Sequence, residues 1–293
     1  MKIVFEPSLV DEIVHLASRD NPARLVERRF FEDKIYEQPV EERREGFYRV
    51  HLELMKRWQL DRPLAESADE FKALDEEIAE ALVAAASPGK DEGADLSWDG
   101  QRVGIKLQPG RFMESHTLKV FFRHEFMHIN DMLDRNFGYR MERFDLTPSQ
   151  EDSVRARYGL LWDISIESRL TKAGKETKIS REAWAERFSS LFSGLPEMDS
   201  LAVFERIWDT PLSRHSDILE KAIEPASLIG AEARPAPRVS GSKCPLCSFP
   251  SYQWVDAPSA ALAMVQADFP RWRAEEGMCP RCSEYYAIKA GIW

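Results

Sequence analysis

Residues 121–131 read FFRHEFMHIND, a helical-looking run in which two histidines lie four positions apart. On a helix, positions i and i+4 share one face, so His124 and His128 present their imidazoles together, with Glu125 beside them. Apolar residues recur on a different face of the same predicted helix, at Phe122, Phe126, Ile129 and Leu133. This periodicity predicts a helix that packs against a core on one side and offers a polar pair on another.

The histidine pair with its adjacent glutamate has the chemistry of a metal site. Two neutral imidazoles and one further ligand bind Zn²⁺ and leave one coordination position open for water. The pKa of that water falls to about 7, so a neighbouring carboxylate can take its proton. We therefore expect His124 and His128 to be ligands of a catalytic zinc, Glu125 to be the general base, and the reaction to be metal-assisted hydrolysis.

A second helix, predicted over residues 149–172, carries two carboxylates in an apolar run. Asp163 and Glu167 lie four positions apart and so share one face of this helix. Buried carboxylates need partners, and a metal with its histidines would supply them. Glu167 is the preferred third zinc ligand, with Asp163 orienting a histidine, and the exchanged assignment is the second choice.

The first helix offers a third arrangement by itself. Asp134 lies where the pattern H-E-x-x-H-x-x-G-x-x-H has its last ligand. That pattern needs a glycine to break the helix at the position that Asp131 occupies here, which weakens this arrangement. Asp131 is then either a ligand itself or a hydrogen-bond partner of a ligand.

The four cysteines form two matching C-P-x-C pairs near the end of the chain. They are Cys244, Cys247, Cys279 and Cys282. In a reducing compartment two such pairs are typical of one tetrahedral four-cysteine zinc site, whereas a redox-active C-x-x-C is a single pair within a thioredoxin-like strand and helix. The sequence thus predicts a second, structural Zn²⁺.

Composition limits the partners and the location. The formal net charge of −10 in 293 residues gives no general attraction to nucleic acid or to an anionic membrane, although a local basic patch is compatible with that sum. No apolar run approaches the roughly 20 residues of a membrane span. The first residues, MKIVFEP, are broken by charge and proline too early for a signal peptide, so the expected location is the cytoplasm.

The pattern along the chain predicts four regions. Residues 1–95 read as an N-terminal helical part of the main domain, including a helix over 67–86, and residues 96–224 read as its core. In the core, residues 102–108 alternate with period two, which predicts a half-buried strand that either forms the upper edge of a substrate cleft or merely packs on the first helix. Residues 225–242 read as a linker, and residues 243–293 form the cysteine module.

The motif of His124, Glu125 and His128, followed by a helix with an acidic third ligand, resembles the zincin superfamily of metallopeptidases and specifically its gluzincin-like branch. The resemblance covers about residues 102–170. It implies an α+β, predominantly helical fold with a zincin-like core, here followed by a small zinc-ribbon domain. Gluzincins have the ligand Glu first and an Asp four residues later, whereas here Asp163 precedes Glu167.

A zincin with a C-terminal zinc ribbon also resembles the SprT-like proteases, which act on proteins attached to DNA. Those proteases use a third histidine after the H-E-x-x-H helix, and the only histidine downstream of His128 is His215. This second assignment is therefore not adopted.

The resulting expectation is a zinc-dependent metallopeptidase that hydrolyses peptide bonds of a peptide or protein substrate. The donor for the tetrahedral oxyanion is left open among Tyr139, Arg157, Tyr158 and His215. The alternative is an adaptor that binds a protein or nucleic acid through the zinc ribbon and whose H-E-x-x-H site is inactive or structural.

Overall fold

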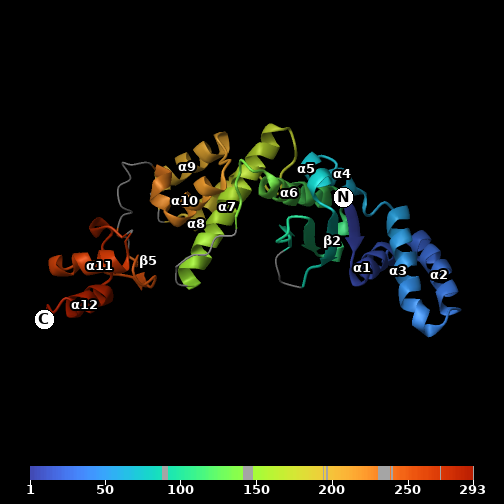
Figure 1. The fold of residues 1–293 in the computed structure, drawn as a ribbon, viewed down its shortest axis with the longest axis horizontal. Coiled ribbons are helices and arrows are strands. Elements are labelled where there is room, and N and C mark those ends of the chain that lie inside the picture. Colours follow the sequence, from blue (N-terminus) through green and yellow to red (C-terminus); the bar gives the residue numbers. More distant parts are fainter. Residues whose placement is uncertain are drawn as a thin grey trace. The chain divides into compact units, whose positions relative to one another are not determined.

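The computed structural model describes residues 1–87, 92–140, 148–193, 195, 197–229, 238, 240–270 and 272–292. This part of the chain is α+β and mostly helical (Figure 1). The chain divides into two compact units. Unit 1 comprises Met1–Leu146, Trp162–Ser180 and Pro211–Asp217, and unit 2 comprises Thr147–Leu161, Arg181–Thr210 and Ile218–Trp293.

A four-stranded mixed sheet lies at the centre of unit 1. Its strands are β1 (Lys2–Phe5), β2 (Glu80–Ala85), β3 (Gly93–Leu96) and β4 (Arg102–Leu107), in the order β1-β2-β4-β3. β1, β2 and β4 are parallel, and β3 pairs antiparallel with β4 at the edge. Residues 1–95 contain β1, β2 and most of β3, so this region is not purely helical.

The predicted strand over residues 102–108 is confirmed as β4, and its side chains alternate between exposed and buried. Of the two alternatives for this strand, the upper edge of a substrate cleft is not supported, because β4 pairs on both sides, with β2 and with β3. The sheet edge next to β4 is β3, which comes from a segment whose composition is typical of a loop.

The prediction of one helix over residues 67–86 is also wrong. The chain there forms α4 (Arg62–Ala68), α5 (Lys72–Glu77) and then β2. Ala81 and Val83 of β2 are fully buried between neighbouring strands and helices. β2 pairs with a parallel strand on each side. This pairing makes the segment a strand despite the local helical preference of a run rich in Ala, Leu and Glu.

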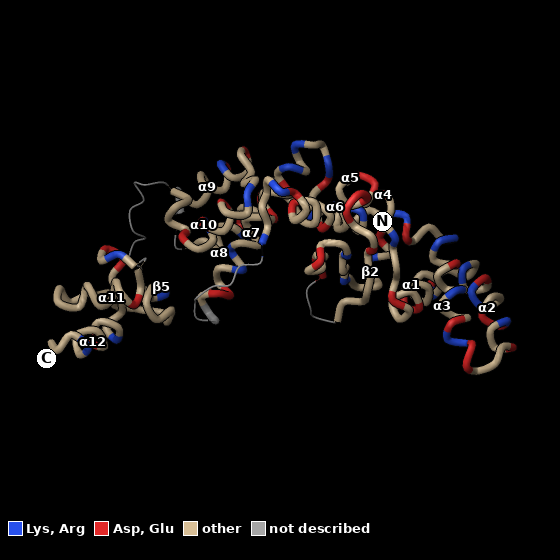
Figure 2. Tube along the Cα trace, viewed as in Figure 1, with Lys and Arg blue, Asp and Glu red and all other residues tan. Residues whose placement is uncertain are grey.

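The first three helices are α1 (Pro7–Arg19), α2 (Pro22–Tyr36) and α3 (Val40–Arg57). Figure 2 shows residues of both charge signs along α2 and α3, and Ile35 is the one described α2 side chain that is buried. Ion pairs cross between the two helices, as between Arg57 and Glu27 at 2.9 Å. The charges are therefore mainly those of solvated helix faces.

The histidine-bearing helix is α6 (Ser115–Leu133), which follows the short 3₁₀ turn η1 (Pro109–Met113). α6 packs against α4, α5 and β3. Phe122, Phe126 and Ile129 are completely buried, as the apolar stripe predicts. The second acidic helix is confirmed as α7 (Pro148–Lys172).

Unit 2 contains the later helices and the cysteine module. The helices are α8 (Arg181–Leu191), α9 (Glu197–Asp209) and α10 (His215–Ile223), of which α10 begins in unit 1. The expected linker begins with a 3₁₀ turn, η2 (Pro225–Ile229), and residues 230–237 and 239 lie outside the described part. The cysteine module contains the following elements: β5 (Ser242–Lys243), β6 (Pro250–Ser251), η3 (Ser259–Ala261), α11 (Leu262–Asp268), η4 (Ala274–Glu276) and α12 (Pro280–Lys289).

Candidate metal centres

His124 and His128 lie on the same face of α6, one helical turn apart. Their Nε2 atoms are 3.2 Å from each other, and the side chains are 1% and 14% exposed. The buried Phe122 and Phe126 hold the opposite side of α6 in the core. The helix is therefore fixed by its apolar side while its histidines stay at the rim of the core.

Asp163 of α7 completes a cluster with these two histidines. Its Oδ1 atom lies 2.9 Å from His128 Nε2 and 3.2 Å from His124 Nε2. Among the described residues, the three side chains form one of two groups whose ligand atoms converge closely enough to hold a metal ion. Sequence alone left the third member of this cluster open, and the geometry favours the second choice.

Glu167, the first choice, occupies a different position. Its Oε1 atom lies 2.5 Å from Nδ1 of His124, and its Oε2 atom accepts a hydrogen bond of 2.9 Å from the backbone N–H of Lys178. Glu167 is completely buried. Because a carboxylate accepts, Nδ1 of His124 carries the proton, and the Nε2 lone pair is then free to bind a cation.

The electrostatics of the cluster follow from burial and these contacts. Burial alone lowers the pKa of His124, but its hydrogen bonds with Asp163 and Glu167 outweigh this effect and raise the pKa above its usual value. Burial would raise the pKa of Asp163, and its hydrogen bonds with His124 and His128 instead hold it well below the ordinary range. A positive charge among these groups is thus strongly favoured.

The donor set fits a zinc ion. Zn–N and Zn–O bonds of about 2.0–2.2 Å in a tetrahedron place neighbouring donor atoms about 3.3–3.5 Å apart. The three observed separations are 2.9, 3.2 and 3.2 Å. With Glu167 fixing the proton on His124 Nδ1, an imidazole lone pair and a carboxylate oxygen face one another, and such an arrangement requires a proton or a cation between them.

Glu125 follows His124 on α6, and its carboxylate is held by β3 and by Lys178. Its Oε2 atom accepts a hydrogen bond of 3.0 Å from the backbone N–H of Ala94 in β3, and its Oε1 atom is 3.0 Å from Nζ of Lys178. Glu125 is 7% exposed. The edge strand of the sheet therefore positions the expected general base.

Asp131 supports the cluster from one side and is not placed as a ligand. Its carboxylate accepts hydrogen bonds from Trp162 Nε1 at 2.8 Å and from both terminal nitrogens of Arg169. The Trp162 ring meets the His128 ring edge to face, with centroids 4.5 Å apart. Asp134 caps the turn after α6 by accepting from Asn136, so the third arrangement has no geometric support.

Two of the four oxyanion candidates lie in unit 1. Tyr139 contacts Trp162 and His215, with ring centroids 5.6 and 5.5 Å apart. These rings form a layer behind Trp162, the residue that packs on His128. Arg157 and Tyr158 belong to unit 2. Sequence patterns did not point to Lys178, the cation beside Glu125, because this residue lies between helices and outside any periodic pattern.

The second group of converging ligands is made by the four cysteines of unit 2, Cys244, Cys247, Cys279 and Cys282. Cys244 Sγ lies 3.9 Å from Cys282 Sγ, and Cys247 Sγ lies 3.7 Å from Cys279 Sγ. These distances exclude S–S bonds of about 2.05 Å. They match the roughly 3.8 Å edge of a tetrahedron with Zn–S bonds of about 2.3 Å, so this cluster could hold a metal ion.

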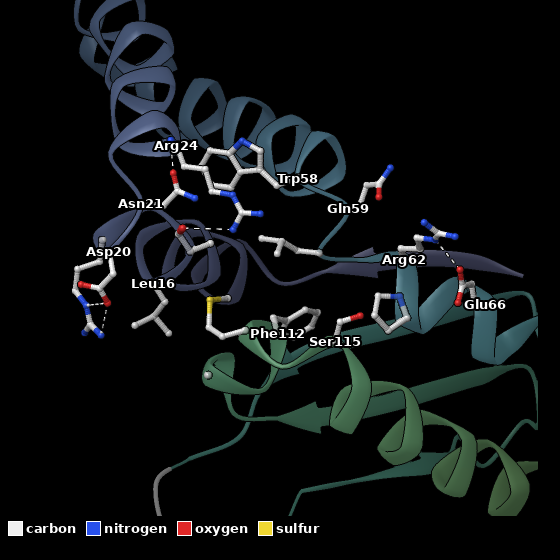
Figure 3. Close-up of a pocket in the computed structure, with 16 residues that line it drawn as sticks. Leu16, Asp20, Asn21, Arg24, Trp58, Gln59, Arg62, Glu66, Phe112 and Ser115 are labelled. Atoms are coloured by element: carbon white, nitrogen blue, oxygen red, sulfur yellow. Dashed lines mark hydrogen bonds and ion pairs between the residues drawn. The ribbon is translucent and has the colours of Figure 1, made fainter. Parts of the chain in front are cut away.

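A separate cavity of about 890 Å³ lies elsewhere in unit 1 (Figure 3). It is lined by residues of α1, α2, α4 and η1, and the guanidinium of Arg24 stacks on the Trp58 ring within it. Two other arginines that line it, Arg19 and Arg62, pair with Asp20 and Glu66. The cavity shares no lining residue with the histidine cluster.

Comparisons of the chain with family models, with curated proteins and with solved structures found no match in any of the three. Within the described residues, no helix is both long enough and apolar enough to cross a membrane.

Proposed function

We propose that the protein is a zinc-dependent metallopeptidase whose catalytic zinc is held by His124, His128 and Asp163. The observation that carries the proposal is the convergence of the three ligand atoms with Glu125 held beside them by β3. Zinc at this site would supply Lewis-acid activation of a water molecule and of a substrate carbonyl. The chain's own residues supply alignment and proton transfer.

Glu125 is the general base in this proposal. A carboxylate has about four lone-pair positions, and the hydrogen bonds from Ala94 and Lys178 use one on each oxygen. Each oxygen therefore keeps a lone pair that can accept a proton from water. The protonated carboxyl group can later donate this proton to the leaving amine. Glu167 does a different task, because it fixes the ring and the proton of His124.

The edge strand β3 supports a peptide as substrate. β3 pairs with β4 on one side only; on its other side the N–H groups of Ala94 and Leu96 donate to Glu125 and Asp95, so an extended chain would be held there through the carbonyl groups of β3. The N–H of Ala94 points from this open side toward Glu125. A peptide bound along β3 would thus run past the general base.

The proposal is tested by two variants of the full-length protein incubated with zinc and fluorescein-labelled casein. Glu125→Gln should retain two zinc ions per chain and lose hydrolysis, because it keeps the size of the side chain and removes the base. His124→Ala should lose one zinc ion and hydrolysis together. A wild-type protein that holds only one zinc ion, or whose cleavage persists in Glu125→Gln, would overturn the proposal.

A second candidate function is a binding module built on the cysteine cluster. The cysteine module exposes several large apolar side chains, namely Phe249, Tyr252, Tyr285 and Ile288, which are 52–75% exposed. Arg281 stacks over the Phe249 ring at 5.8 Å. Exposed aromatics beside a cation are typical of surfaces that contact another molecule.

Deletion of residues 241–293 distinguishes the two candidates. Casein hydrolysis that survives the deletion supports a peptidase that carries a separate binding module. Absence of hydrolysis in both the full-length and the shortened chain, with loss of a binding partner on deletion, supports the binding module as the function.

A further inference from the structure

The segment after α7, residues 173–180, returns to α6, where Lys178 contacts Glu125. We call it the return segment. Gly174 has φ +67°, a conformation that glycine adopts without strain. The backbone N–H of Lys175 donates to the carbonyl of Leu170 at 2.9 Å, which closes the end of the helix. The chain thereby reverses after α7.

Two polar side-chain contacts hold the return segment near α6. Lys175 Nζ lies 3.0 Å from Glu70, whose carboxylate also forms a two-point contact with Arg123 of α6. Glu176 lies 3.2 Å from His116 in the first turn of α6. Lys178, the next cation along the segment, is thereby delivered to the centre of α6.

Lys178 contacts Glu125 and Glu167. These two carboxylates support the cluster but are not placed as metal ligands. The backbone N–H of Lys178 donates to Glu167 at 2.9 Å, and Glu167 in turn fixes His124. Its ammonium group lies 3.0 Å from Glu125. One residue thus sets the positions of the expected base and of the group that orients a ligand.

We infer that Lys178 is a positioning residue of the active site, aligning Glu125 through its side chain and His124 through its backbone contact with Glu167. This inference rests on the proposed function for its catalytic consequence. The Lys178 side chain is 32% exposed, and its ammonium group contacts one carboxylate oxygen of Glu125 while the N–H of Ala94 donates to the other. Glu125 is clamped between the two.

The first test replaces the side chain in the full-length, zinc-loaded protein. Lys178→Met should lower kcat for fluorescein-labelled casein about 10- to 100-fold, with KM and the zinc content unchanged. Lys178→Arg keeps a cation and should recover most of the loss. Lys119→Met is the matched control, because Lys119 of α6 pairs with Glu66 at 2.7 Å and its side chain is 34% exposed, close to that of Lys178, and it should leave kcat within about twofold.

Two outcomes of this test would overturn the inference. An unchanged or increased kcat in Lys178→Met would mean that the ammonium group does not align Glu125. Equal losses in Lys178→Met and Lys119→Met would mean that the loss follows from removing any half-buried lysine pair and not from the position of Lys178.

The second test needs neither zinc nor activity. In the metal-free protein, the amide hydrogen of Lys178 should exchange with solvent at least about tenfold more slowly than that of Glu176, because it donates to a buried carboxylate. The protection should disappear in Glu167→Ala. Rapid exchange in the wild type would refute the backbone contact. If casein is not cleaved at all, the proposed function fails, and this measurement still decides the placement of Lys178.

Discussion

Asp163 and Glu167 differ by one methylene and by one turn of α7, and these differences separate their contacts. Asp163 reaches the Nε2 atoms of both histidines, whereas Glu167 contacts Nδ1 of His124. From the sequence, the two carboxylates share a helix face, and Glu167 was the preferred ligand. Which one meets the lone pairs depends on how α7 is placed along α6, and no local pattern specifies that placement.

The two carboxylates should therefore respond differently to substitution. We expect Asp163→Ala to lose the zinc of the histidine cluster, because it removes a ligand atom. Glu167→Gln should retain this zinc with an affinity about 10- to 100-fold lower, because it weakens only the orientation of His124. Competition with a chromogenic zinc chelator measures both affinities, and the opposite ranking would contradict the assignment.

Glu70 gives a prediction for stability against pH. Its two-point hydrogen bond with Arg123, opposed by partial burial and assisted by Lys175, lowers its pKa from 4.5 to about 2. A lowered pKa in the folded state means that the stabilisation is present above pH 4.5 and is lost as the pH falls toward 2.

We expect Glu70→Gln to lower the free energy of unfolding at pH 7 by about 1–2 kcal/mol, a value reduced from the full pKa shift for solvent screening. The difference from the wild type should shrink as the pH falls from 4.5 toward 2. Urea unfolding at several pH values measures it. A difference that stays constant across this range would show that the pair with Arg123 does not stabilise the fold.

At the scale of elements, the edge strand β3 is one of the parts that sequence patterns missed, as β2 is. Gly93–Leu96 is short, lies in a segment with a loop-like composition and shows no alternation between buried and exposed residues. The same holds for β1, only four residues long. The longer elements α6, α7 and β4 were predictable, because each repeats its period several times.

The backbone of β3 offers a matched pair of substitutions. The N–H of Ala94 donates to Glu125, and since N–H groups alternate in direction along a strand, that of Asp95 points toward β4. Ala94→Pro should keep the fold and lower kcat about 10- to 100-fold, because Glu125 loses one of its two anchors.

Asp95→Pro is the control, and it should lower the melting temperature, because it removes a hydrogen bond between β3 and β4. Circular dichroism melting and casein hydrolysis follow the two effects. Identical behaviour of the two proline variants would contradict the assigned role of the Ala94 N–H.

At the scale of the whole molecule, the two metal clusters belong to different compact units. The histidine cluster lies in unit 1 and the four cysteines lie in unit 2. The paired C-P-x-C spacing predicted the second cluster directly, since each pair supplies two thiols from one short loop. The first cluster takes its ligands from two helices that are far apart in the sequence, so a motif predicted only the two ligands on α6.

The two clusters should therefore lose metal independently. Cys244→Ser is expected to remove one zinc ion per chain and to leave casein hydrolysis within about threefold of the wild type, because the two clusters share no ligand and belong to separate compact units. Metal analysis by plasma mass spectrometry with parallel activity measurement tests this. Loss of both ions in this single variant would show that the clusters are coupled.

The histidine cluster also has a consequence for how long the folded chain survives. His128 and Asp163 are 35 positions apart in the chain, so an ion held between them would act as a removable cross-link that closes a long loop. A cross-link of this kind restricts the unfolded chain more than the folded one. Chelation of the ion would then hasten global unfolding, and digestion by an added protease would accelerate even where no substrate is being cleaved.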